Sequence, residues 1–360
     1  MVRLNLALVA ASAAVALVRA AKPAGFNWVA EGFEAPTSYD APQALASLNA
    51  AVSAGVNTFS LSFPWYIANT SVTGPIYAVP GGVPSGAPFN NASTPANASI
   101  LTAIRAVHAL GAAVVLRPMI DPHWSAHQHG NSCWRGEIGS NFTQQQWDEF
   151  FLTYSHYILA WAAVAEAEHV ETLCIGAELL STETQEAHWR ALFTAVRAVF
   201  KGSVYYSSTG SDVAWWDVSD FIAQDMYPSL TNSTAEPDVV SVDDLVTAWG
   251  AYLVRFHDMS VRFNKTVLLQ ETGICSVNKT GIFNTPAFFE CYGLPIDDAV
   301  QAKYYEAVFR GVYPLPWIEG ITFWKWGAQG GPSDPTFFPL NKSTMGVIAE
   351  YLRPATPRRS

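Results

Sequence analysis

The feature that most constrains the fold of this chain is a series of eight short apolar runs, each bounded by Gly, Pro or Asp. Such runs indicate strands, and the stretches between them have helical spacing. Eight strands that alternate with helices favour a closed parallel barrel, the (β/α)8 or TIM barrel fold of class α/β, in a single domain. The expected strands are residues 25–30, 56–63, 112–120, 170–178, 203–208, 220–227, 266–272 and 320–326.

A doubly wound open sheet is the competing architecture. Neither G-x-G-x-x-G nor G-x-x-x-x-G-K-[ST] opens an expected helix, so the sequence offers no phosphate-binding turn. The strongest helical pattern lies at 183–201, where apolar residues make one face. The stretch 66–97, rich in Pro, Gly and Asn, is expected to be an ordered loop over the barrel mouth. The other expected helices are 41–53, 98–110, 143–166, 242–262 and 297–312.

The N-terminus has the layout of a secretory signal peptide. One early Arg precedes a mostly apolar run from Leu4 to Val18, and small residues suit cleavage after Ala20. A signal anchor is the alternative, but the run is Ala-rich and short for a membrane span. We expect a signal peptide at 1–20 and one folded domain at 21–355, secreted and free of the membrane after cleavage.

Asparagine and cysteine usage agree with an oxidising eukaryotic secretory route. Cys275 and Cys291 flank one loop and could be joined across it, whereas Cys174 lies in an apolar run and is expected to be a buried thiol. The pairing of all four cysteines, Cys133 included, stays open. N-x-S/T, the N-glycosylation motif, occurs at Asn69, Asn91, Asn97, Asn141, Asn232, Asn264, Asn278 and Asn341.

The net charge and the spacing of the histidines indicate which kinds of molecule this protein could bind. The net charge of −10 argues against nucleic acid and anionic membranes, so a neutral substrate fits better. His123, His127 and His129 are loosely spaced like metal ligands, but the sequence offers no fourth ligand. We interpret their segment as a polar loop and expect no metal, no cofactor and a monomeric protein.

In a parallel barrel, functional side chains lie where the strands end and the loops begin. Two carboxylates stand out among the polar residues there, because Glu178 ends the fourth expected strand and Glu271 ends the seventh. A pair of carboxylates across a cleft is what cleavage of a glycosidic bond requires. The full set at strand ends is Arg117, Asp121, His123, Glu178, Asp225, Tyr227, Glu271, Trp324 and Trp326.

These residues resemble glycoside hydrolase clan A, whose (β/α)8 members carry glutamates at the ends of strands four and seven. Within the clan the chain is most similar to the β-mannanases of glycoside hydrolase family 113, over residues 25 to 352. The motifs that carry this resemblance are WRGEI (134–138), CIGAEL (174–179), HWRALFTAVR (188–197), WWDVSDFIAQDMYP (215–228), LLQETG (268–273) and FWKW (323–326).

The resemblance implies a role for each matching residue. Glu178 would be the general acid and base, and Glu271 the nucleophile. Tyr227 would hold Glu271 by a hydrogen bond, and Arg117 would keep it ionised. Asp225, on the same strand face as Tyr227, is the substitute if Glu271 is not the nucleophile.

Aromatic side chains are expected to form the sugar platforms, because the C–H faces of sugars stack on indole rings. Trp324 or Trp326 would lie under the cleaved sugar, only one of them pointing inward, and Trp326 is favoured. His123 and Trp124 would contact sugar as well. Further candidate platforms are Trp28, Trp65 and Trp134, whereas Trp161, Trp189 and Trp249 are expected in the core.

Two positions depart from the clan pattern. Most members carry Asn just before the acid/base, where it binds the sugar 2-hydroxyl, but here the residue is Ala177. Ser208, Thr209 and Gly210 follow the fifth strand where another Asn is expected. Because mannose differs from glucose in its axial 2-hydroxyl, these departures bear on the sugar more than on the reaction.

The sequence thus predicts a secreted, N-glycosylated, retaining endo-β-1,4-mannanase that needs its two carboxyl groups about 5 Å apart. Another clan A β-glycosidase, such as a β-glucanase or β-glucosidase, is the first alternative, favoured if the 66–97 loop closes the cleft into a pocket. A non-catalytic carbohydrate-binding barrel is the second alternative.

Overall fold

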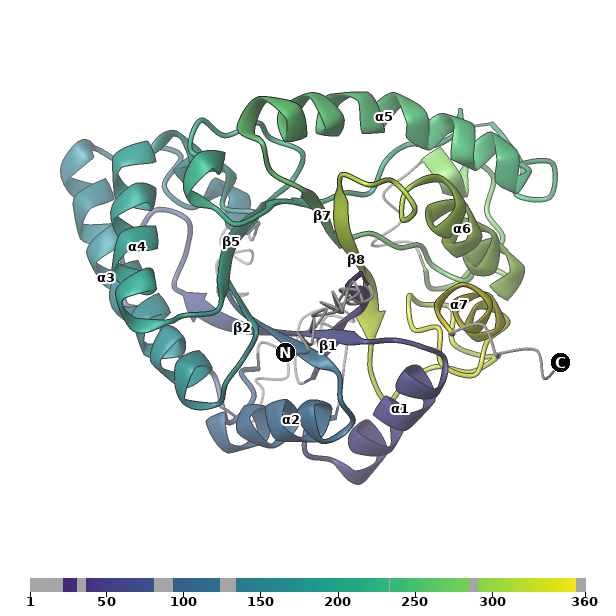
Figure 1. Cartoon of the computed structure of the whole chain (residues 1–360), viewed down its shortest axis with the longest axis horizontal. Helices are drawn as coiled ribbons and strands as arrows, with labels where there is room; N and C mark the ends of the chain where they lie inside the picture. The colour runs from purple at the N-terminus through teal and green to yellow at the C-terminus, as the bar shows by residue number, and fades with distance from the viewer. Residues whose placement is uncertain are drawn as a thin grey trace, which may run out of the picture.

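A computed structural model describes residues 22–30, 37–80, 93–123, 134–232, 234–284 and 291–353. Eight parallel strands close into one barrel in chain order, with helices around its outside (Figure 1). The predicted single-domain (β/α)8 barrel is therefore confirmed. The strands are β1 (Ala24–Val29), β2 (Thr58–Ile67), β3 (Ala113–Pro122), β4 (Thr172–Ala177), β5 (Ser203–Ser208), β6 (Ile222–Asp225), β7 (Val267–Glu271) and β8 (Ile318–Trp326).

The helices follow from local signals in the sequence. Capping boxes open α3 at Thr143 and α5 at Ser241, each satisfying backbone N–H groups that a helix start leaves unpaired. The six predicted helices are present, and a further one, α7, was not predicted. Their bounds are α1 (Pro42–Ser53), α2 (Asn97–Ala109), α3 (Gln144–Ala167), α4 (Glu186–Val199), α5 (Val242–Phe263), α6 (Asp298–Gly311) and α7 (Thr344–Leu352).

Large aromatic residues fill the layer between barrel and helices. Trp161, Trp189 and Trp249 are buried in the core, as expected. Trp28 is fully buried and packs on Tyr39 and Phe59, so its prediction as a sugar platform is wrong. The cause is strand alternation: its neighbour Asn27 is hydrogen-bonded to Gln270 of β7 across the barrel interior, which directs Trp28 to the helical layer.

Some predictions fall on residues that the structure does not describe. They concern the segment 1–20, Asn91, Trp124, His127, His129 and Cys133. Cys174 is a buried free thiol, as predicted. Among the described helices, none combines the length and the apolar character that crossing a membrane requires.

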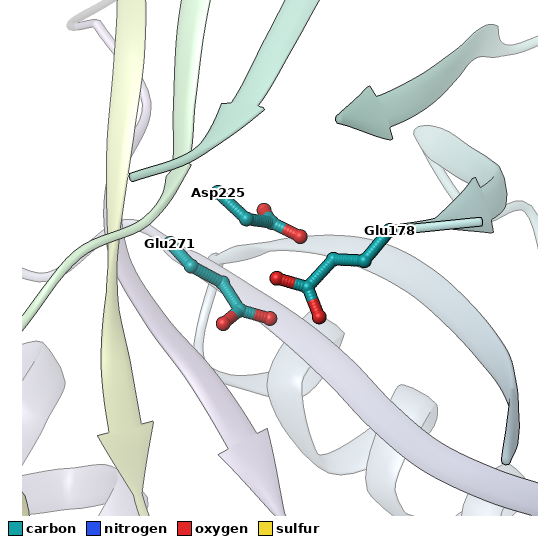
Figure 2. Close-up of side chains that lie close together, drawn as sticks. All are labelled: Glu178, Asp225 and Glu271. Carbon is teal, nitrogen blue, oxygen red and sulfur yellow. The ribbon is translucent and has the colours of Figure 1, made fainter. Parts of the chain in front are cut away.

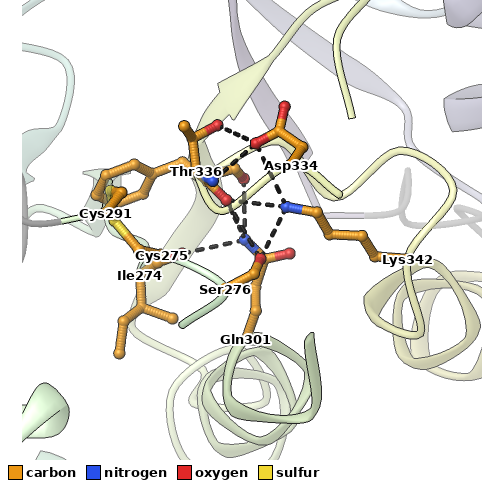
Figure 3. The surroundings of a disulfide bond; sticks show 9 residues. Ile274, Cys275, Ser276, Cys291, Gln301, Asp334, Thr336 and Lys342 are labelled. Carbon is orange, nitrogen blue, oxygen red and sulfur yellow. Dashed lines mark hydrogen bonds and ion pairs between the residues drawn. A yellow bond between two sulfur atoms is a disulfide. The ribbon is translucent and has the colours of Figure 1, made fainter. Parts of the chain in front are cut away.

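The loop after β7 is fixed to the loop after β8 (Figure 3). A disulfide joins Cys275 to Cys291, the pairing that the sequence analysis gave as a possibility and left open. The buried Lys342 ammonium donates hydrogen bonds to Ser276 Oγ at 2.8 Å and to the Thr336 carbonyl at 3.0 Å. Burial lowers the pKa of Lys342 to about 8. Because Glu271 ends β7, these contacts fix the loop that directly follows this carboxylate.

Gly176 in β4 is required by the packing of α4 on the barrel. A Cβ atom at this position would lie 2.7 Å from Trp189 Cη2 and 2.8 Å from Tyr206 Cδ2. Both aromatic side chains are fully buried, so neither can move into solvent.

We expect Gly176→Ala to lower the free energy of unfolding by about 1–3 kcal/mol, because the added methyl group overpacks the core. Urea unfolding followed by tryptophan fluorescence measures this change. Gly250→Ala in α5 is the matched control: a Cβ there meets nothing within 4 Å, and alanine should raise the stability by about 0.5–1 kcal/mol. Equal stability of wild type and Gly176→Ala would contradict the packing argument.

Candidate active site

Three carboxylates converge at the C-terminal end of the barrel. Glu178 directly follows β4, Asp225 ends β6 and Glu271 ends β7. One carboxylate oxygen of each lies within 4.8 Å of the others, and Figure 2 shows the three side chains directed toward one another. The two glutamates expected to meet therefore do so, with a third carboxylate beside them.

A buried arginine links two of these carboxylates. Arg117 of β3 donates through Nη1 to Glu271 Oε1 and through Nη2 to Asp225 Oδ2, the latter at 2.6 Å. Asp225 also accepts a 2.6 Å hydrogen bond from Ser207 Oγ, and its side chain has no exposed surface. Asp225 is thus enclosed as an ion-pair partner, and a substrate cannot reach it in place of Glu271.

Glu271 is held through both of its oxygens. Arg117 occupies Oε1, and the Tyr227 hydroxyl donates to Oε2 at 2.8 Å, the contact that the resemblance implied. Burial raises the pKa of Tyr227 well above its usual value, so the hydroxyl keeps its proton and remains a donor. Both oxygens of Glu271 therefore have a hydrogen-bond donor, and these contacts hold the carboxylate in one orientation.

Glu178 has a different environment. Its backbone adopts φ of 56°, in the left-handed region that non-glycine residues rarely occupy, at a cost of about 1–3 kcal/mol. The Glu178 N–H donates to the Ser207 carbonyl at 2.8 Å, which ties this turn to β5. Its side chain is 18% exposed, against 6% for Glu271.

The electrostatics of Glu178 favour a bound proton. Burial, followed by the negative charge of Glu271, raises the pKa of Glu178 to about 7. Two guanidinium groups, Arg135 and Arg117, act in the opposite direction. At mildly acidic pH Glu178 is therefore mostly protonated and can act as an acid, whereas Glu271 is paired with a cation.

Arg135 was not among the predicted site residues. It lies in a short 3-10 helix, η2 (Arg135–Glu137), and donates through Nη1 to Glu178 Oε2 at 3.2 Å. Its Nε and Nη2 bind both oxygens of Asp121, at 2.7 and 3.0 Å. The sequence did contain two indications of this residue: the motif WRGEI, and Asp121, its partner, at a strand end. The strand-end rule could not identify Arg135 itself, because a loop and not a strand brings it to the site.

The preference for Trp326 over Trp324 is wrong. Trp326 is fully buried and donates its indole N–H to Ser47 Oγ of α1 at 3.0 Å. Residues two apart normally share a strand face, but the register between β1 and β8 shifts between these two tryptophans. Trp324 is 8% exposed. Its backbone N–H donates a hydrogen bond to the carbonyl of Thr272, the residue after Glu271.

Three more residues were predicted to contact the sugar: His123, Trp65 and Trp134. His123 follows β3, with its ring 5.8 Å from that of Tyr66 and 6.1 Å from that of Tyr77. Trp65 packs on Tyr157 of α3, at the outer wall of the barrel rather than in the site. Trp134 is 41% exposed and directly precedes Arg135 in the chain, so this candidate platform reaches solvent.

The three carboxylates could in principle bind a divalent cation, since carboxylate oxygens are its usual ligands. Asp225 and Glu271 already pair with Arg117, and Glu178 contacts Arg135. Two guanidinium charges at this position would repel a metal ion. The residues therefore fit a proton-transfer site better than a metal site.

Sequence comparison identifies the family. The model of Glycoside Hydrolase Family 113 matches residues 28–335, most of the chain. This chain belongs to glycoside hydrolase family 113. The predicted resemblance is thus confirmed, and the protein is a glycoside hydrolase. A search of curated proteins found no match.

Solved structures agree with the family 113 fold. A GH113 β-mannanase from Alicyclobacillus acidocaldarius is 22% identical, with a TM-score of 0.72 over 91% of this chain and 96% of that one. An endo-β-1,4-mannanase from Thermotoga petrophila is 14% identical, with a TM-score of 0.54 over 92% and 76%. A β-glucuronidase from Ruminococcus gnavus is 11% identical, with a TM-score of 0.59 over 92% and 50%. At these identities the likenesses show the shared fold alone.

In this family 113 protein, we expect Glu271→Gln to lower the pKa of Glu178 from about 7, because the substitution removes a negative charge that raises it. A decrease of about one unit is expected. Carbon NMR of 13C-glutamate-labelled protein, with Glu178 assigned from its Gln variant, follows the titration. Glu168→Gln, which alters a residue in a surface ion pair with Arg105, should leave the titration unchanged. An unchanged or raised value in Glu271→Gln would contradict the assigned coupling.

Proposed function

We propose that this protein is a retaining endo-β-1,4-mannanase. The observation that carries the proposal is the separation of the carboxylates, whose nearest oxygens lie within 4.8 Å. Retaining glycosidases place their carboxyl groups about 5–5.5 Å apart, whereas inverting enzymes leave about 6.5–9.5 Å for a water molecule. The mannanase names of its family 113 relatives support mannan as the substrate.

The proposed reaction has two displacement steps. Glu271 attacks the anomeric carbon while Glu178 gives its proton to the departing glycosidic oxygen, leaving a covalent glycosyl-enzyme. Glu178, now a carboxylate, takes a proton from water, whose oxygen attacks the same carbon and releases Glu271. Each carboxylate thereby returns to its starting state, and the configuration at the anomeric carbon is retained.

The geometry supports this division of roles. Arg117 and Tyr227 donate to the two oxygens of Glu271 and hold the carboxylate in place, which suits a nucleophile. Glu178 has a pKa of about 7, close to that of an acid that must also serve as a base. In the proposed complex Trp324 lies under the sugar being cleaved, and Trp134 borders the leaving group.

Hydrolysis assays on β-mannan, β-glucan and xylan test the proposal. We expect wild type to release products from β-mannan, and Glu178→Ala and Glu271→Ala to lose about 100- to 10,000-fold in kcat. Proton NMR of the first products should detect the β-anomer. Glu168→Ala at the surface serves as the control.

Each competing outcome has a clear meaning. Preference for glucan would favour the alternative β-glucanase, for which Ala177 in place of the usual Asn provides a reason. Equal product release by wild type and both alanine variants would refute the site. Early appearance of the α-anomer would refute the retaining mechanism.

We further propose that the protein is secreted as an N-glycosylated monomer after removal of residues 1–20. The Cys275–Cys291 disulfide fits an oxidising route. The seven acceptor asparagines that the structure describes are all exposed or half-buried.

We expect protein secreted by a eukaryotic host to begin at Ala21 and to lose mass on treatment with an N-glycosidase. Mass spectrometry of the N-terminal peptide and of the whole chain provides both readouts. An intact N-terminus at Met1 in the secreted protein would contradict the cleavage.

A further inference from the structure

We propose that Arg135 and Asp121 form a positioning pair that keeps Glu178 able to donate a proton in one step and to take one back in the next. This inference rests on the proposed function, because it assigns both an acid and a base step to Glu178. Arg135 acts on Glu178, and Asp121 acts through Arg135.

The contacts define this pair. Arg135 binds Asp121 through two parallel hydrogen bonds, the strong bidentate geometry of guanidinium and carboxylate, and offers its remaining nitrogen, Nη1, to Glu178 at 3.2 Å. The side chains are 11% exposed for Arg135 and 18% for both Asp121 and Glu178. Such partial burial makes the interaction between these charges stronger than at the open surface.

Arg135 is also held at the backbone. The carbonyl of the next residue, Gly136, accepts a 2.8 Å hydrogen bond from Ser181 Oγ, which lies three residues after Glu178. Ser181 Oγ also lies 2.9 Å from Ser140 Oγ. The short helix that carries Arg135 is therefore hydrogen-bonded to the segment after Glu178. These contacts help to position Arg135 Nη1 at 3.2 Å from Glu178 Oε2.

The charges around Glu178 explain why an arginine is useful here. Burial and the Glu271 anion raise the pKa of Glu178, and a carboxyl group with too high a pKa would be a poor proton donor to the glycosidic oxygen. Arg135 and Arg117 lower this pKa, and Asp121 raises it. In the part of the chain that the structure describes, Asp225 and Tyr227 also interact electrostatically with Glu178. Asp121 therefore holds Arg135 in position and also reduces the extent to which Arg135 lowers the pKa of Glu178.

This arrangement makes the two members act in opposite directions. Without the Arg135 cation, Glu178 should hold its proton to higher pH. Without the Asp121 anion, the charge of Arg135 is no longer offset, and Glu178 should lose its proton at lower pH. A merely structural role would not produce opposite shifts.

The test measures kcat/KM as a function of pH on the β-manno-oligosaccharide that wild type cleaves. The quantity compared is the midpoint of the alkaline limb, where activity falls because Glu178 loses its proton. Arg135→Met should move this limb up by about one pH unit, and Asp121→Asn should move it down by a smaller amount. Arg135→Lys, which keeps the charge, should restore the limb toward wild type while lowering kcat. The matched control is Arg105→Met, which removes another arginine bidentate to a carboxylate, on the surface at Glu168.

An unchanged limb in Arg135→Met, or shifts of the same sign in Arg135→Met and Asp121→Asn, would overturn the inference. Carbon NMR titration of Glu178 reads the same property without turnover, so weakly active variants still decide the question. If wild type hydrolyses none of the polysaccharides, the proposed function fails, while the NMR shifts still measure the effect of the pair on Glu178.

Discussion

The structure depends on the placement of one buried cation. Arg117 lies wholly inside the barrel, where an uncompensated charge would cost several kcal/mol. Its charge is neutralised by Asp225 at the end of β6 and by Glu271 at the end of β7, which lie next to Arg117 because these strands meet β3 inside the closed barrel. Removing one partner of such a buried pair typically costs about 3–5 kcal/mol. The interaction that neutralises this buried arginine is therefore also the one that positions the Glu271 carboxylate.

Each of the two glutamates is served by an Asp–Arg pair. Arg117 joins Asp225 to Glu271, and Arg135 joins Asp121 to Glu178. Arg117 and Asp225 have no exposed side-chain surface, whereas Arg135 and Asp121 are partly exposed, and Arg135 contacts Glu178 at 3.2 Å. The same three residue types thus hold Glu271 in a buried ion pair in one place and leave Glu178 with a pKa of about 7 in the other. Environment, not residue type, separates the two roles.

The sequence was sufficient for the barrel and for the two glutamates, because both follow from patterns local to a strand. Expected strand boundaries agree with the structure to within about four residues, and Glu178 and Glu271 stand at strand ends as predicted. Arg135 could not be found by the same rule, since its position depends on the path of a loop. The error at Trp326 came from an irregular register between β8 and β1, which alternation along a single strand cannot reveal. Helix α7 was missed as well.

The left-handed backbone of Glu178 has a consequence for how such a protein can change over evolutionary time. Glycine is the residue that adopts this conformation without strain, so the substitution that best relaxes the turn would also remove the carboxyl group that we propose as the proton donor. At this position the stability of the turn and the proposed catalytic role therefore favour different residues. On the proposed function, a relative of this protein that no longer needed catalysis would gain stability from glycine at this position while keeping the barrel.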